Sequence, residues 1–271
     1  MDALHDKEMR LKTLLLEYGS LAVAFSGGID STFLLYMAQQ VLGARALAVT
    51  AAPAFVSPGD LEEAAAFCRT RGIRQIVIPS GALQLEEARR NPPDRCYICK
   101  MEIFGKIQEA ALREGIPWVA EGSNLDDTAD YRPGMRAIRE RNIISPLLEC
   151  GFTKAEIRAL SKEHGLPAWD RPSSACLASR FVYGEAITDE KLAAVDRAEQ
   201  LLKALGFRQC RVRVHGSLAR IEVLPAEVQR LAERDLREKL LKELRTYGFR
   251  YVTLDLAGYR TGSMNEELML Q

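Results

Sequence analysis

Apolar positions in the first part of the chain alternate between the period of strands and the period of helices. Short apolar runs of strand length begin at Ala22, Ala46, Gln75 and Trp118. Continuous runs of this kind are typical of strands buried on both faces of a parallel sheet, and the stretches between them show helical spacing. The expected strands are residues 22–25, 46–50, 75–79 and 118–122, and the expected helices are residues 3–17, 32–42, 58–71, 99–113 and 153–164.

This alternation predicts an α/β fold, a doubly wound parallel sheet with helices on both faces. Ligands of such sheets bind beyond the carboxyl ends of the strands. We expect the first domain to span residues 1–165. Residues 166–187 show no regular period, and a loop of this length inside a compact protein is usually functional or disordered. Its aromatic and apolar residues argue against disorder, so we interpret it as a functional loop.

The last part of the chain, residues 188–271, predicts a smaller α+β domain for substrate binding and self-association. Its expected helices are residues 190–205 and 226–247, and its expected strands are residues 209–214, 219–224 and 250–256.

Arg211 and Arg213 alternate with valines in the first of these strands, so both arginines share one face. Such a face is either an ordinary polar surface or an anion site, because guanidinium groups bind phosphate in a bidentate manner.

The first expected strand opens onto Ser26-Gly-Gly-Ile-Asp-Ser31. Gly27 and Gly28 permit a tight turn, and the free amides at the following helix start can point at anionic oxygens. The loop is shorter than G-x-x-x-x-G-K-[ST] and lacks its lysine. Phosphate charge must therefore be met by amides, by the hydroxyls of Ser26 and Ser31, and by Mg²⁺ held partly by Asp30. The loop resembles that of enzymes that split ATP between the α- and β-phosphates.

An acidic segment follows the fourth expected strand and contains Asp126 and Asp127. Asn, Asp, Pro and Gly favour turns, so the segment can be read as a solvated loop. Its position at the carboxyl end of a strand favours a second role, because Mg²⁺ on a nucleotide takes oxygen ligands near the phosphates. We expect these two aspartates to face the nucleotide.

Three of the six cysteines are candidates for chemistry: Cys96 and Cys99 in a C-x-x-C motif, and Cys176 in the functional loop. A C-x-x-C pair can hold a metal, act as a redox pair or ligate an Fe–S cluster, or it can be ordinary buried packing. Tetrahedral zinc needs a fourth protein ligand, and no second C-x-x-C follows. Three thiolates suit a [4Fe–4S] cluster with one open iron. The cysteines expected to be structural are Cys68, Cys150 and Cys210.

Composition and net charge indicate which partners and which cellular locations can be expected for this protein. The 271 residues include 37 Lys plus Arg and 37 Asp plus Glu, so the formal net charge is zero. A bulk basic excess, usual for proteins that bind tRNA, is absent, so nucleic acid is not expected as a partner. The sequence has no apolar run of membrane-spanning length and no signal-peptide layout, so we expect a cytoplasmic protein that does not bind membranes. Six cysteines are too few for a disulfide scaffold.

A set of motifs in fixed order carries a family resemblance over nearly the whole length. The chain resembles the LarE family, the ATP-dependent sulfur transferases of nickel-pincer nucleotide cofactor synthesis, which belong to the PP-loop ATP pyrophosphatases. The first motif is shared with many pyrophosphatases, and the later ones together are more specific. The motifs are Ser26-Gly-Gly-Ile-Asp-Ser31, Asp130-Tyr-Arg-Pro-Gly134, Cys176 followed by Ser179-Arg-Phe-Val-Tyr-Gly184, Arg211-Val-Arg-Val-His215, Ala219-Arg-Ile-Glu222 and Gly248-Phe-Arg-Tyr-Val-Thr-Leu-Asp255.

The resemblance implies a small-molecule nucleotide substrate, pyridinium-3,5-biscarboxylic acid mononucleotide. A carboxylate is adenylylated by ATP, sulfur displaces AMP, and a thiocarboxylate results. One branch sacrifices the sulfur of a cysteine at the position of Cys176, and another carries a [4Fe–4S] cluster on three cysteines. Cys96 and Cys99 make this chain similar to the second branch. Ser179 and Arg180 join Arg211 and Arg213 as expected substrate ligands, and a homo-oligomer is expected.

Three other functions stay open on the sequence. A tRNA thiolase combines the same loop with three cysteines and a cluster, although zero net charge speaks against it. A non-catalytic adenine-nucleotide sensor could carry a structural zinc at Cys96 and Cys99. An amide-forming ligase would need an ammonia source, and the sequence offers none.

Overall fold

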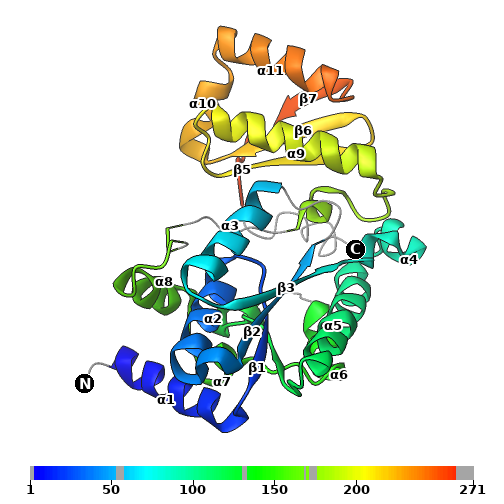
Figure 1. Ribbon diagram of the computed structural model, residues 1–271. Coiled ribbons are helices and arrows are strands. Elements are labelled where there is room, and N and C mark those ends of the chain that lie inside the picture. The colour runs from blue at the N-terminus through cyan, green and yellow to red at the C-terminus, as the bar shows by residue number, and fades with distance from the viewer. Residues whose placement is uncertain (1–2, 53–57, 130–132, 168, 171–175, 261–271) are drawn as a thin grey trace. The chain divides into compact units, whose positions relative to one another are not determined.

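The computed structural model describes residues 3–52, 58–129, 133–167, 169–170 and 176–260 (Figure 1). Contacts divide the chain into unit 1, residues 1–85 with 94–173, and unit 2, residues 86–93 with 174–271. The segment 86–93 therefore belongs with the C-terminal part of the chain. Asp130, Tyr131 and Arg132 of the second family motif lie outside the described residues, as do residues 171–175 of the functional loop.

Unit 1 contains a four-stranded sheet in the order β3-β2-β1-β4, with every neighbouring pair parallel. Its strands are β1 (Leu21–Ala24), β2 (Ala46–Ala52), β3 (Arg74–Pro79) and β4 (Val119–Ala120). The expected doubly wound α/β fold is thereby confirmed. The strand expected at residues 118–122 has only two residues in β4, and beyond it the Glu121 carboxylate accepts bonds from the amide and hydroxyl of Ser123.

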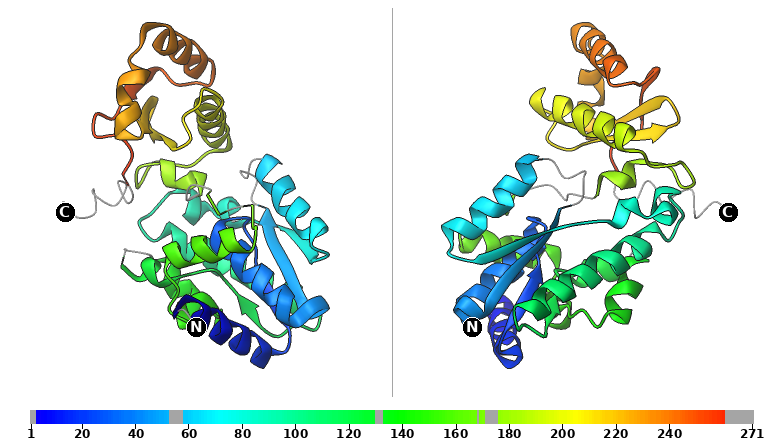
Figure 2. Two further views of the ribbon diagram at one scale, coloured as in Figure 1. Left: turned by 90° about the vertical axis from the view of Figure 1, so that its left-hand side faces the viewer. Right: turned by 45° about the vertical axis from the view of Figure 1, so that its right-hand side comes forward.

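Helices cover both faces of this sheet (Figure 2). The α-helices of unit 1 are α1 (Ala3–Tyr18), α2 (Ile29–Leu42), α3 (Pro58–Thr70), α5 (Arg95–Arg113), α6 (Gly134–Glu140), α7 (Pro146–Glu149) and α8 (Lys154–Glu163), and the 3-10 turns are η1 (Gly43–Arg45), η2 (Ala82–Gln84) and η3 (Leu125–Ala129).

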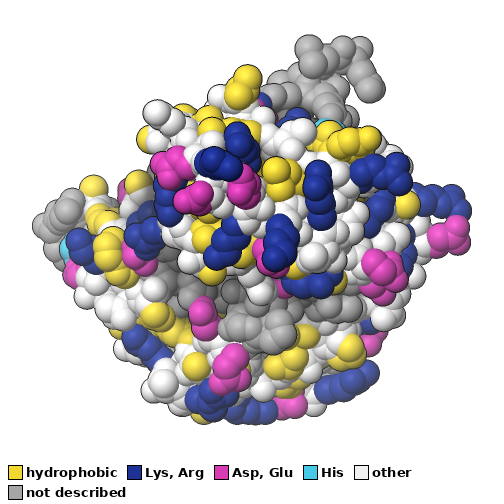
Figure 3. Space-filling model, turned by 90° about the horizontal axis from the view of Figure 1, so that it is seen from above, with side chains coloured by type: hydrophobic (Ala, Val, Ile, Leu, Met, Phe, Trp, Pro, Cys, Tyr) yellow, Lys and Arg dark blue, Asp and Glu magenta, His cyan; other side chains and the backbone are white. Residues whose placement is uncertain are grey.

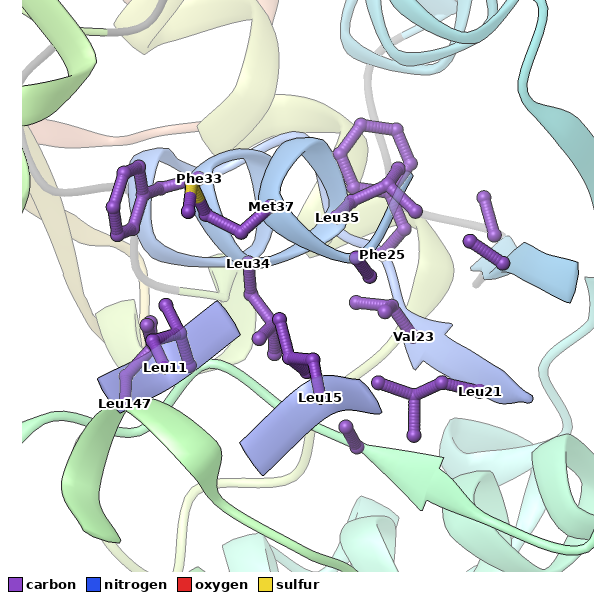
Figure 4. Packing of buried hydrophobic residues seen from close by; sticks show 14 of the residues in the cluster. Leu11, Leu15, Leu21, Val23, Phe25, Phe33, Leu34, Leu35, Met37 and Leu147 are labelled. Atoms are coloured by element: carbon purple, nitrogen blue, oxygen red, sulfur yellow. The ribbon is translucent and has the colours of Figure 1, made fainter. Parts of the chain in front are cut away.

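The core of unit 1 has two parts, because successive strand side chains point to opposite faces. Val23 of β1 packs with Leu11, Leu15 and Leu34 from α1 and α2 (Figure 4). Its neighbour Ala22 packs on the other face with residues of α5 and α6: Phe104, Ile107 and Ile138. The sheet is thus held between two helix layers, and its strand ends are left for the site.

Unit 2 is built on a three-stranded sheet in the order β5-β6-β7. The β5–β6 pair is antiparallel and the β6–β7 pair is parallel. The elements are α4 (Glu86–Arg89), η4 (Leu177–Arg180), α9 (Asp189–Ala204), β5 (Cys210–His215), β6 (Leu218–Val223), η5 (Pro225–Glu227), α10 (Val228–Leu231), α11 (Arg234–Thr246) and β7 (Tyr251–Leu254).

Two helix predictions were wrong in their bounds. The helix expected at residues 226–247 is broken into η5, α10 and α11. At about 100° per residue, a continuous helix would place Leu231 roughly opposite Leu240. The break lets both leucines be buried. The helix expected to begin near Cys99 begins at Arg95, directly after Asp94, so Cys96 is its second residue and Cys99 its fifth.

Candidate active site

The loop after β1 is held in shape by its own hydroxyl groups. Gly27 has φ 75°, which favours glycine. The hydroxyls of Ser26 and Ser31 lie 3.1 Å apart, and that of Ser31 donates to the carbonyl of Gly28 at 3.0 Å. Gly28 is the N-cap of α2, so the amides of the first turn of that helix lie at the carboxyl end of β1. This arrangement suits a bound phosphate group.

Asp30, in the first turn of α2, is the centre of a charged network. Its carboxylate forms an ion pair with Lys154 and accepts a bond from the Asn124 amide at 3.3 Å. Burial raises the pKa of the Asp30 carboxyl; Lys154 opposes the shift, and the charge of Asp127 adds to it.

Asp126 and Asp127 are both brought to this network, with different partners. Asp127 accepts a bond from the backbone amide of Asn124 at 3.0 Å. Asp126 accepts one from the backbone amide of Lys154 at 2.7 Å and so caps the start of α8. Across the described residues, no three His, Cys, Asp or Glu side chains are grouped so that they could hold a metal ion.

Lys154 and Asn124 are residues of this site that the sequence analysis missed. The sequence contains one signal for Lys154, because a lysine in the first turn of a helix lies at the positive end of its dipole, where a cation is disfavoured. The first turn itself is well held. Thr153 and Glu156 form a capping box, and Lys7 of α1 binds Glu156 at 2.8 Å. These contacts fix the first turn of α8 and thereby the position from which Lys154 reaches Asp30.

Gly122 sets how closely the β4 end approaches the loop. A Cβ atom there would lie 2.9 Å from the Ser31 amide nitrogen and 3.1 Å from the carbonyl carbon of Asp30. Only glycine lets these two backbone segments pass at this distance.

All six cysteines, each within the described part of the chain, are thiols. Cys68, Cys150 and Cys210 are buried. Burial raises the pKa of Cys68 to about 11 and of Cys210 to about 12, and it also raises the pKa of Cys150. These thiols are poor nucleophiles and poor ligands, in keeping with a packing role.

Cys96 and Cys99 lie three residues apart near the start of α5 in unit 1. The first is exposed and the second is half-buried. Residues at this spacing share a helix face. Arg95 donates to the sulfur of Cys96 at 3.7 Å.

Cys176 is exposed and directly precedes η4 in unit 2. Its carbonyl accepts a bond from Arg180 at 3.1 Å, and the same guanidinium donates to the Ser179 hydroxyl at 2.9 Å. The cysteine is thus tied to two of the expected substrate ligands.

The three expected substrate arginines of unit 2 are 3%, 7% and 5% exposed at Arg180, Arg211 and Arg213, so they do not form a solvated polar face. Arg180 binds both carboxylate oxygens of Glu199, at 2.8 and 2.9 Å. Arg213 binds Glu222 at 2.9 Å.

Ser179 joins these groups, because its carbonyl accepts a bond from Arg213 at 2.9 Å. Burial and the neighbouring Arg180 lower the pKa of Arg211, while Glu199 acts in the opposite direction. The buried cluster therefore holds charges of both signs, because Arg180 is paired with Glu199 and Arg213 with Glu222.

A parallel α/β sheet with this loop defines an ATP-using enzyme of the PP-loop class. The sequence model of the NAD synthase family matches residues 8–87. One component of the glutamine-hydrolyzing GMP synthase of Thermoplasma acidophilum is 28% identical over 201 residues, which are 68% of this chain and 64% of that protein.

Two relatives cover the chain almost completely. An uncharacterized protein of Synechocystis is 42% identical over 96% of this chain and 98% of its own length. The pyridinium-3,5-bisthiocarboxylic acid mononucleotide synthase of Lactiplantibacillus plantarum is 36% identical over 99% of this chain and 97% of its own length. The chain belongs to the LarE family, of which that synthase is a member.

Proposed function

We propose that this enzyme adenylylates a carboxylate of pyridinium-3,5-biscarboxylic acid mononucleotide and converts it to a thiocarboxylate. The observation that carries the proposal is the arrangement at η4, where Cys176 is bonded to Arg180 beside Ser179 and two further buried arginines. The product name of the Lactiplantibacillus plantarum relative supports the same chemistry.

In the first step, the chain's own groups hold ATP and its leaving pyrophosphate. The amides at the start of α2 and the hydroxyls of Ser26 and Ser31 bind phosphate oxygens. Mg²⁺ would be held by Asp30 with Asp127 and would offset the charge on the phosphates. Lys154 supplies the cation that the loop lacks, because its ammonium group can release the Asp30 carboxylate and bind the pyrophosphate.

Binding of the substrate nucleotide belongs to unit 2 in this proposal. Arg180, Arg211, Arg213 and Ser179 bind its phosphate and its second carboxylate, since guanidinium groups pair with both in a bidentate manner. The first carboxylate attacks the α-phosphorus of ATP, and pyrophosphate leaves. Residues 188–271 would also carry the interface of a homo-oligomer, which stays a prediction, as does a cytoplasmic location.

We propose that sulfur arrives through a [4Fe–4S] cluster on Cys96, Cys99 and Cys176. Cys96 and Cys99 lie three residues apart on α5, and Cys96 and Cys176 are exposed, so these thiols are accessible to an incoming cluster, although the described residues contain no preformed group of three such side chains. When bound, the cluster would supply sulfide to the acyl-adenylate. If no cluster forms, Cys176 itself is the donor and the nucleophile toward the adenylate.

A tRNA thiolase remains the alternative. Lys and Arg side chains are interspersed with Asp and Glu on the face shown in Figure 3, rather than gathered by sign. No helix in the described part of the chain is long and apolar enough to cross a membrane.

Anaerobic incubation with ATP and either the biscarboxylic mononucleotide or bulk tRNA tests the proposal directly. Pyrophosphate release and a thiocarboxylate product with the mononucleotide support the proposal. Formation of thiolated tRNA would instead show that the protein is a tRNA thiolase.

Lys154→Met is expected to slow pyrophosphate release and to move the acid limb of its pH profile to higher pH. Lys154 lowers the pKa of Asp30, so its loss raises that pKa further and reduces the ionised fraction at a given pH. Lys162→Met, in the last turn of the same helix, is the control and should leave the profile unchanged. An unshifted acid limb in Lys154→Met would contradict the proposed coupling.

Arg211→Ala and Arg213→Ala are each expected to weaken binding of the substrate nucleotide by roughly 1.5–3 kcal/mol, because each removes a charged partner of an anion. Arg213→Ala also takes one cation from the buried Glu222, so it should lower the melting temperature more. Calorimetric titration measures both variants against Arg237→Ala, an exposed arginine of α11. Unchanged affinities would leave the arginines with a structural role only.

A further inference from the structure

Asn91 of unit 2 is a buried asparagine in a backbone conformation that few residues adopt. It is 0% exposed, and its φ of 54° lies in the left-handed region, which asparagine tolerates better than most residues other than glycine. Burial of a side-chain amide is costly unless the amide forms hydrogen bonds. The bonds of Asn91 reach a part of unit 2 that is distant in the sequence.

The side chain of Asn91 holds the backbone that directly follows η4. Its amide donates to the carbonyl of Val182 at 2.7 Å and to that of Phe181 at 3.3 Å, although Phe181 is 90 residues further along the chain. The backbone carbonyl of Asn91 accepts a bond from the Gly184 amide at 2.9 Å. A single buried residue thus binds three successive points of the segment 181–184.

Further contacts strengthen this attachment. The carbonyl of Arg89 accepts a bond from the amide of Ile187 at 2.8 Å, and the Arg89 guanidinium binds Asp189, in the first turn of α9, at 2.8 Å. The side chain of Phe181 is buried, and its backbone forms a parallel bridge with Val214 of β5. The backbone after η4 is therefore fixed both to the chain after α4 and to the sheet of unit 2.

This fixed backbone leads directly into two of the expected substrate ligands. Ser179 and Arg180 are the last two residues of η4 and immediately precede Phe181. Hydrogen bonds to a ligand weaken steeply away from their preferred distance and angle, so such side chains act only when their backbone is well placed. The bonds from the Asn91 amide therefore bear on the position of both ligands through the backbone.

We propose that Asn91 is a positioning residue that holds Ser179 and Arg180 in the place where they bind the substrate nucleotide. The inference rests on the proposed role of these two residues in substrate binding, and it adds a residue from a different part of the sequence. Loss of the amide gives η4 conformational freedom, which must be lost again when the nucleotide binds. The cost falls on binding of this nucleotide and not on binding of ATP, which the proposed function assigns to unit 1.

The test compares Asn91→Gly with Asn142→Gly. Glycine keeps the positive φ and removes the amide. Asn142 is the matched control, because it also has a positive φ, of 52°, and is exposed. Calorimetric titration measures the affinity for pyridinium-3,5-biscarboxylic acid mononucleotide and, separately, for ATP. Asn91→Gly should bind the mononucleotide about tenfold or more weakly and ATP as the wild type does. Asn142→Gly should match the wild type with both ligands.

Hydrogen exchange followed by mass spectrometry separates positioning from a general loss of stability. A positioning role predicts faster exchange in residues 177–184 of Asn91→Gly, with exchange in the buried strands β1 and β2 unchanged. A residue with a purely structural role would speed exchange throughout the chain and weaken both ligands alike, and that result overturns the inference. Unchanged mononucleotide affinity in the folded variant overturns it as well.

If Asn91→Gly does not fold, Asn91→Asp decides. Aspartate fills the same space and tolerates a positive φ, but its ionised carboxylate cannot donate to the two carbonyls. Weaker binding of the mononucleotide alone supports the inference, and wild-type affinity overturns it. Wild-type protein that does not bind the mononucleotide overturns the proposed function together with this inference, whereas a wild type and a variant that bind it equally well overturn the inference alone.

Discussion

Asp30→Asn is expected to reduce ATP-dependent pyrophosphate release by at least about 100-fold, the usual cost of losing a group that stabilises transition-state charge. The variant keeps the side-chain shape but removes the charge that would hold Mg²⁺ and pairs with Lys154. Release is measured with the mononucleotide substrate at saturating ATP. Asp6→Asn, an exposed acid in the first turn of α1, is the matched control.

The same variant should not lower the melting temperature at neutral pH. Burial raises the pKa of Asp30 above its unfolded value, so the carboxyl contributes stability when it is protonated at low pH. That contribution is lost as the pH rises through the folded pKa, and the ionised carboxylate then costs stability. Replacing it with a neutral amide removes this cost. Full pyrophosphate release by a folded Asp30→Asn protein would overturn the assignment of the phosphate loop.

Alanine at Cys96, Cys99 or Cys176 is expected to abolish iron binding and sulfur transfer together, while pyrophosphate release continues. A cluster with only two protein ligands is poorly held, so the three positions should behave as one. Iron, sulfide and thiocarboxylate are quantified on anaerobic protein. Cys150→Ala is the control, because that thiol is buried and burial raises its pKa.

A sacrificial Cys176 would give a different pattern. Cys176→Ala would be inactive, whereas Cys96→Ala and Cys99→Ala would keep at least one turnover. Mass spectrometry after turnover would also show a loss of about 34 Da, because sacrifice removes the elements of H₂S from the polypeptide. Such a loss from wild-type protein that holds no iron would refute the cluster.

The phosphate loop and the parallel sheet were predictable because their signals are local. Gly27 needs a positive φ, and the serine hydroxyls that shape the loop lie within five residues of one another. Buried parallel strands have continuous apolar runs, which stand out in a sequence without any knowledge of their neighbours. The family motifs rest on the same kind of short, ordered pattern.

The partners of the charged groups could not be predicted in this way. Lys154 is 124 residues from Asp30, and Arg180 of η4 meets Glu199 of α9, which lies 19 residues further along the chain. Alternation places Arg211 and Arg213 on one face of β5, but it does not say whether water or protein covers that face. The break before α11 follows from burying leucines that a continuous helix would separate.

The sequence by itself therefore determined the elements whose signals lie within one turn or one strand: the loop, the sheet and the C-x-x-C motif. Only the tertiary structure decided which of the charged residues are buried and which opposite charges they meet. The reason is physical. Backbone periodicity is set by neighbours along the chain, whereas desolvation and ion pairing depend on distances between segments that folding alone brings together.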